Sequence, residues 1–182
     1  MKKVTFRWVL HQLKDEQKKE RVRLYRENLA KFRGGSWQLC DIITGDETKF
    51  EPKNLFSIFF KSNGPILIHA IDEDKTIDHK YYIENCLKPV IKEIWKQRKS
   101  AGTKSIKLLH DNARPHTHSD VINYLTEEGI IIMPHPPYSP DFALCDYWLN
   151  DYIKHRLTGQ PNKKSLACEV SKVVKNIPEE KF

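Results

Sequence analysis

Two periods of apolar and polar positions follow one another along the chain. Over residues 15–32, apolar side chains recur every three or four positions, which predicts an amphipathic helix that Asp15 caps and Gly34-Gly35 ends. Segments 37–50, 55–60 and 66–71 are instead typical of strands, and a turn at 62–65 joins the last two into a hairpin. The predicted stripe of the helix consists of Val22, Tyr25, Leu29 and Phe32.

The second half of the chain alternates helices and strands. Residues 78–95 predict a helix that Pro89 should kink. A short strand at 106–109, a helix at 117–129 with a Thr117–Asp120 capping box, and a strand at 130–133 follow. A helical region then begins around Ser139 and Pro140. Three antiparallel strands before strand–helix alternation predict an α/β fold, with a mixed sheet flanked by helices. This is the element order of a ribonuclease H-like domain.

Composition and length agree with one globular domain. The chain has 182 residues, of which 39% are hydrophobic and 30% charged, so a low-complexity or disordered protein is excluded. It contains no apolar run long enough for a membrane span and no secretory signal at its start, which predicts a soluble intracellular protein without a membrane partner. The four cysteines lack metal-finger spacing, which argues against a structural zinc site. The sequence has no Gly-rich cofactor loop, so we expect no organic cofactor.

The net charge of +7 is concentrated at the start of the chain. Residues 1–34 contain 11 basic and 4 acidic residues, whereas residues 35–182 carry equal numbers of each. A basic helix of this kind is the electrostatic footprint of a polyanion partner, and an ordinary solvated helix face explains the pattern equally well. The candidate nucleic-acid-binding residues are Lys2, Lys3, Arg7, Lys18, Lys19, Arg21, Arg23 and Arg26.

Three aspartates stand where predicted strands meet loops or helices. Asp46 lies on the first strand, Asp111 follows the strand at 106–109, and Asp146 opens the last helical region, with 34 residues between the second and the third. Converging carboxylates are hard oxygen ligands that cannot all ionise close together without cations. Two Mg²⁺ or Mn²⁺ ions at such a site could bridge a phosphodiester. Aspartates at strand ends are, however, more often caps or turn residues.

Four strings make the interpretation specific: TGDET (44–48), HDNARPH (110–116), HPPYSPD (135–141) and CDYWL (145–149). In this order, and with the 34-residue gap, they resemble mariner-family transposases over nearly the whole chain. The resemblance implies a ribonuclease H-like catalytic domain over 35–182, preceded by a basic linker helix over 1–34. It also implies a metal-binding catalytic triad of Asp46, Asp111 and Asp146, which hydrolyses transposon-end DNA and joins the 3′-hydroxyl to target DNA in the nucleus.

Other residues of these motifs have two readings each. Arg114 and His116 could contact phosphate or order the site, or Arg114 and Pro115 could shape the turn. Asn112 could orient Asp111 or serve only the turn. Glu47 should point to the other side of the strand from Asp46, which excludes it from the metal set.

The chain also departs from the family pattern. It starts at the linker, without the helix-turn-helix units expected to recognise transposon ends, and the expected C-terminus is shortened. The loop after Phe50 is short, which weakens the expected homodimer, and Leu144 stands where the family has proline. Without that proline, a helix could continue from Ser139 through Asp146 and rotate its carboxylate. The alternative to an enzyme is therefore a degenerate, non-catalytic remnant that binds nucleic acid weakly.

Overall fold

The computed structural model describes residues 12–50, 54–72, 75–157 and 163–178. Five strands form one mixed sheet in the order β3-β2-β1-β4-β5. β1 (Ile42–Phe50), β2 (Asn54–Lys61) and β3 (Gly64–Ile71) are antiparallel neighbours, whereas β4 (Lys107–Leu109) and β5 (Ile131–Ile132) extend the sheet in parallel. The predicted α/β fold class and mixed sheet are confirmed. No helix among the described residues is long and apolar enough to cross a membrane.

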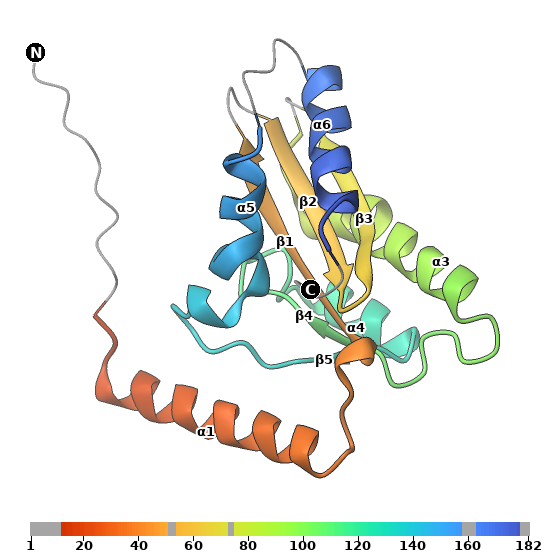
Figure 1. Cartoon of the computed structure of the whole chain (residues 1–182). Coiled ribbons are helices and arrows are strands. Elements are labelled where there is room, and N and C mark those ends of the chain that lie inside the picture. The colour runs from red at the N-terminus through yellow and green to blue at the C-terminus, as the bar shows by residue number, and fades with distance from the viewer. Residues whose placement is uncertain (1–11, 51–53, 73–74, 158–162, 179–182) are drawn as a thin grey trace, which may run out of the picture.

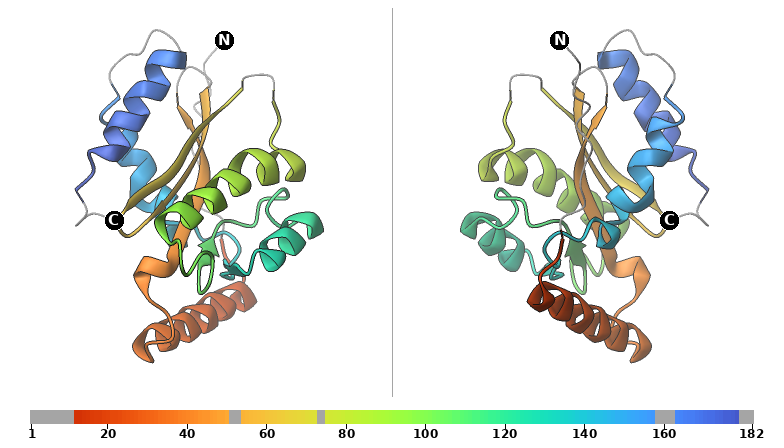
Figure 2. Two further views of the ribbon diagram at one scale, coloured as in Figure 1. Left: turned by 90° about the vertical axis from the view of Figure 1, so that its right-hand side faces the viewer. Right: turned by 90° about the vertical axis from the view of Figure 1, so that its left-hand side faces the viewer.

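Helices cover both faces of the sheet, which makes three layers (Figures 1 and 2). One face carries a continuous helical run: α2 (His79–Tyr81), a π-helical segment (Tyr82–Leu87) and α3 (Lys88–Gln97), together with α4 (Ser119–Glu127). The opposite face carries a π-helical segment (Cys145–Leu149), α5 (Asn150–Lys154) and α6 (Lys163–Lys175). Each layer has its own apolar core, because β2 alternates Phe59 toward the first and Phe56, Ile58 and Phe60 toward the second.

α1 (Asp15–Arg33) lies at the end of the sheet near β5, apart from the two helical layers (Figure 1). Its N-cap is Lys14, whose backbone N–H donates to Gln17, so the prediction that Asp15 caps the helix is wrong. The predicted stripe is also partly wrong: Val22 and Tyr25 are exposed, and the buried positions are Leu24 and Asn28. Gly34 ends the helix as predicted, and Gly35 adopts a positive φ.

Several predicted boundaries move by a few residues. The first strand begins at Ile42, because a 3₁₀ turn (Leu39–Asp41) precedes it. The helix after Asp78 is confirmed, and its irregularity is the π-helical segment that leads into Pro89 at the start of α3. The predicted capping box is wrong: the N-cap of α4 is His118, whose side chain accepts from the backbone N–H of Asp120.

The expected helix from Ser139 through Asp146 does not form. A 3₁₀ turn (Pro140–Phe142) follows Ser139, and Ala143 then adopts an extended conformation, with φ −90° and ψ 109°. The π-helical segment that carries Asp146 starts afresh after Leu144. Although Leu144 replaces a proline, the 3₁₀ turn and the π-helical segment therefore remain separate.

Candidate active site

The strand register brings two of the three aspartates side by side. β1 and β4 pair in parallel, with Thr44 opposite Leu109. Continued two residues beyond the last pair, the same register would set Asp46 on β1 opposite Asp111, which follows β4, and the charge of Asp111 does act on Asp46. Asp146 reaches the same region from the π-helical segment, because Cys145 beside it is buried against the sheet in the core of the second helical layer.

A cavity of about 980 Å³ opens over this end of the sheet, and Asp111 and Asp146 both line it. His135 and Tyr138 of the proline-rich loop also line it. Tyr138 is exposed and adopts a positive φ of 53°, a conformation rare for a bulky side chain. Asn112 links the loop after β4 to the proline-rich loop, since its side chain donates a 2.7 Å hydrogen bond to the carbonyl of His135.

Each aspartate uses one carboxylate oxygen to hold its position. Oδ1 of Asp46 accepts from the backbone N–H of Glu47, Oδ1 of Asp111 accepts from the backbone N–H of Ala113, and Oδ1 of Asp146 accepts from the Asn150 side chain. The Oδ2 atoms have no hydrogen-bond partner among the residues that the structure describes. Three carboxylates fixed by one oxygen, with the other left over, form a donor set suited to a hard divalent cation.

The carboxyl of Asp46 is electrostatically unfavourable as an anion. Burial, the largest cause, raises its pKa to about 8, and the charges of Asp146, Glu47 and Asp111 act in the same direction. A raised pKa from burial and like charges is the signature that part of this cluster must be neutralised, by a proton or by a cation.

Asp111 is stabilised as an anion by the adjacent imidazole. Nδ1 of buried His116 lies 2.7 Å from Oδ1 of Asp111, and this hydrogen bond is the main cause that lowers the pKa of Asp111. Nε2 of His116 lies 3.2 Å from Oε2 of Glu47, at ion-pair distance, although its N–H is not aligned with that oxygen for a hydrogen bond. Burial opposes protonation of His116, but the two carboxylates outweigh it and raise its pKa to about 9.

The sequence interpretation missed the role of Glu47. Strand alternation correctly turns its side chain away from Asp46, toward Ser57 and His116. Through His116, however, Glu47 is coupled to Asp111, and the Glu47–His116 contact joins residues 69 positions apart, which no local pattern signals. The contact between His116 and Asp111 did have a sequence signal. In the HDNARPH string the histidine follows the aspartate by five residues, so its imidazole can fold back onto that carboxylate.

His135 is a second residue that the sequence reasoning left without a role. It is half-buried, its Nδ1 lies 3.0 Å from the carbonyl of Pro136, and its Nε2 is buried without a hydrogen-bond partner among the described residues. Burial lowers its pKa, so the ring is neutral at pH 7 and its Nε2 carries a lone pair. It lines the same cavity as Asp111 and Asp146, which makes it a candidate to contact a bound ligand.

The remaining candidates lie at the periphery. Arg114 is exposed. Lys2, Lys3 and Arg7 fall outside the described residues. On α1, Arg21 donates to Ser139 and forms a 2.7 Å ion pair with Asp141, which fixes the helix to the proline-rich loop. Intrahelical ion pairs also engage Lys18 with Asp15 and Arg23 with Glu20 and Glu27, whereas Lys19 and Arg26 are exposed without an ion pair to any described residue.

A five-stranded mixed sheet with helices on both faces, carrying acidic residues on β1, after β4 and on the following helical region, has the architecture of a ribonuclease H-like fold. The particular likeness is to Mos1 mariner transposase: a crystal structure of its catalytic domain superposes with a TM-score of 0.86 at 24% identity, covering 96% of this chain and 88% of that one. The resemblance to mariner-family transposases inferred from sequence is thereby confirmed. No family model matches the chain.

Two curated proteins are similar in sequence. The histone-lysine N-methyltransferase SETMAR of Homo sapiens is 31% identical over 108 residues, which is 59% of this chain and 16% of that protein. The mariner Mos1 transposase of Drosophila mauritiana is 24% identical over 183 aligned positions, which is 85% of this chain and 52% of that protein. The chain thus spans about half the length of the transposase and about one sixth of SETMAR.

Proposed function

We propose that this chain is the catalytic core of a mariner-like DNA transposase, which cleaves DNA at transposon ends and transfers the strand with divalent metal. The observation that carries the proposal is the carboxylate cluster. Asp46, Asp111 and Asp146 each keep Oδ2 without a partner among the described residues, and the pKa of Asp46 is raised to about 8 in their company.

The donor set fits Mg²⁺ or Mn²⁺, because all three candidate ligands are carboxylate oxygens. Two bound ions would supply charge for the attacking and the leaving oxygen of a phosphodiester displacement. Ligands of two ions about 3.5–4 Å apart need not all touch one another, and the three aspartates are not a set with all ligand atoms within 4.8 Å. Structures of the Mos1 catalytic domain with Mn and with Mg share this fold, which supports the choice of ion.

In this proposal, neighbouring residues hold the carboxylates and the cavity loops in place and balance part of the negative charge. His116 holds Oδ1 of Asp111, which leaves Oδ2 to face a ligand, and its positive charge compensates one of the carboxylates. Asn112 keeps the proline-rich loop against the Asp111 loop, so that His135 lines the same cavity as Asp111 and Asp146. Such fixed placement supplies the orientation on which phosphoryl-transfer catalysis depends.

DNA is the proposed partner and substrate, and the nucleus the proposed compartment. Mos1 transposase has been solved as a paired-end complex with the left transposon end, in a chain of which the present one covers 61% with a TM-score of 0.85. Residues 1–34 act in this proposal as a basic linker helix and residues 35–182 as the catalytic domain, with assembly as a homodimer. No organic cofactor is required.

A plasmid-nicking assay tests the proposal. The purified chain should convert supercoiled plasmid to open circles in Mg²⁺ or Mn²⁺ and not in EDTA. Asp111→Asn and Asp146→Asn should each abolish nicking, because a lost ligand charge removes ion binding. Asp151→Asn is the matched control, since Asp151 is exposed on α5 five residues after Asp146.

Nicking that survives in both triad variants would refute the proposed site. If the unmodified chain binds DNA but never nicks it in either metal, the non-catalytic remnant is the correct description. Filter binding of DNA to the same preparations distinguishes a loss of nicking from a loss of DNA binding. The triad variants should still bind DNA, because the substitutions leave the basic helix intact.

A further inference from the structure

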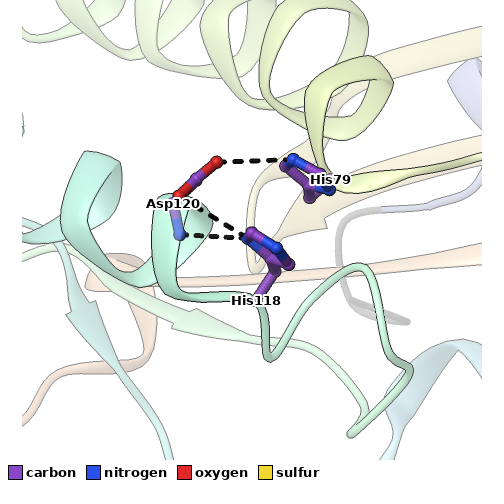
Figure 3. Close-up of side chains that lie close together, drawn as sticks. All are labelled: His79, His118 and Asp120. Carbon is purple, nitrogen blue, oxygen red and sulfur yellow. Dashed lines mark hydrogen bonds and ion pairs between the residues drawn. The ribbon is translucent and has the colours of Figure 1, made fainter.

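Two histidines and an aspartate lie together where two helices begin, outside the aspartate site (Figure 3). His79 is the first residue of α2, His118 is the N-cap of α4, and Asp120 lies in the first turn of α4. Nε2 of His79 is 3.3 Å from Oδ2 of Asp120, and Nδ1 of His118 is 3.7 Å from Oδ1 of the same carboxylate. One ligand atom from each residue lies within 4.8 Å of the other two.

We propose that His79, His118 and Asp120 form a binding site for a divalent transition metal of the zinc class. Two imidazole nitrogens and one carboxylate oxygen are ligands typical of Zn²⁺, whereas Mg²⁺ prefers oxygen alone. The site is therefore chemically distinct from the three-aspartate cluster and selects a different ion. Among the described residues, it is the group whose ligand atoms are already close enough to share an ion.

The ligands can close on an ion with small movements. The two rings are stacked, with centroids 3.7 Å apart and an angle of 6° between their planes, so their in-plane lone pairs lie in neighbouring parallel planes. To share an ion, at least one ring would turn about its Cβ–Cγ bond so that both nitrogens come within the Zn–N distance of about 2.0–2.1 Å. Nδ1 of His118 already presents a lone pair, because it accepts from the Asp120 backbone N–H, and it would exchange this bond for the ion. That N–H lies at a helix N-terminus and is then free for water.

Access to the site is open from solvent. The side chains of His79, His118 and Asp120 are 24%, 40% and 54% exposed, so an ion can enter without local unfolding. A bound ion would tie the start of the helical run 79–97 to the start of α4. Because α4 directly follows the loop that carries Asp111 and His116, this tie would anchor that loop at its far end.

Calorimetric titration of the full chain with ZnCl₂ tests the proposal. The titration is done in a Cys40→Ser/Cys168→Ser background, because these two exposed thiols could bind zinc themselves. One equivalent of Zn²⁺ should bind, and at about 100 times its Kd it should raise the Tm by roughly 5 °C or more. MgCl₂ at the same concentration should not replace it at this site.

Variants separate this site from others. His79→Gln and His118→Asn should each weaken zinc binding by at least about 10-fold, the low end of losses for perturbed metal sites. Asparagine is itself a preferred N-cap residue, so His118→Asn removes the imidazole and preserves the helix start. His155→Gln, at an exposed histidine of the opposite layer, and Asp111→Asn should leave zinc binding unchanged.

Zinc binding that is equally tight in the His79→Gln/His118→Asn double variant would overturn the proposal. So would the absence of a bound equivalent in the parent chain, or loss of binding in Asp111→Asn. None of these results depends on nicking activity, so the zinc site stands or falls separately from the proposed transposase function.

Discussion

Replacing Asp46 with asparagine should stabilise the metal-free protein. The pKa of Asp46 is raised from 3.8 to about 8, mainly by burial. Below pH 3.8 the carboxyl is protonated in both the folded and the unfolded chain, so it does not change the free energy of unfolding with pH. Between pH 4 and 8 the folded state holds a proton that the unfolded state has released, so the free energy of unfolding falls as pH rises. Above pH 8 the loss is complete.

The magnitude follows from the pKa. At pH 7, about three units above the ordinary value, keeping Asp46 protonated costs about 4 kcal/mol at 1.36 kcal/mol per unit. Asparagine is neutral and can keep the bond that Oδ1 accepts from the Glu47 backbone. Asp46→Asn should therefore gain up to about 4 kcal/mol at pH 7, which for a domain of this size raises the Tm by about 8 °C or more. A buried carboxyl with so strongly raised a pKa is typical of a functional site.

Urea unfolding followed by circular dichroism measures this difference. Both proteins are unfolded in EDTA at pH 5, 6, 7 and 8 and constant ionic strength, with the exposed Asp151→Asn as control. The advantage of Asp46→Asn should widen steadily from pH 5 to 8, and Mg²⁺ should narrow it by stabilising only the parent. A variant that is no more stable than the parent at pH 7, or an advantage that does not grow with pH, would refute the electrostatic account.

Three further outcomes are expected. Gly45→Ala should destabilise the fold by about 1–3 kcal/mol and reduce nicking, as urea unfolding and the plasmid assay would show, because its Cβ would collide with the fully buried ring of Phe59. His116→Gln should lower the free energy of unfolding most below about pH 6.5, where the imidazolium of the parent contributes fully. The difference in urea unfolding should shrink as pH rises through about 9, where the parent loses that charge, and a difference that does not change with pH would contradict this. Arg26→Ala should reduce the salt slope of DNA binding by about 1 in filter binding, whereas ion-paired Arg23→Ala should change it less; equal slopes would mean a merely solvated face.

Local patterns were enough to predict the sheet and its flanking helices. Strand segments and the helix after Asp78 depend on short-range periodicity and turns, and they appear within a few residues of their predicted bounds. The buried face of α1 was wrong for a physical reason. The helix meets the proline-rich loop more than 100 residues away, where Arg21 contacts Ser139 and Asp141, and a local pattern does not contain such a contact. Leu24 and Asn28 are buried in place of Val22 and Tyr25.

The sequence pointed to the three carboxylates of the proposed site and not to the residues that contact them. Strand ends and the motif strings pointed to Asp46, Asp111 and Asp146, and the continued register of β1 and β4 supports the first two as neighbours. The His79 and His118 pair had no sequence signal, because the two residues are 39 positions apart and meet only when two helix starts pack together. Such contacts are a property of the tertiary structure.

The two sides of β1 differ in how their charge is balanced. On one side, the imidazolium of His116 lies between Glu47 and Asp111, so two carboxylates share one cation and the pKa of Asp111 is lowered. On the other side, burial is the main cause that raises the pKa of Asp46, and the charge of Asp146 adds to it, with no cationic partner for Asp46 among the described residues. Asp111 belongs to both sides through its two oxygens. A divalent cation would therefore gain most beside Asp46 and Asp146, where the negative charge is uncompensated, and least beside Glu47.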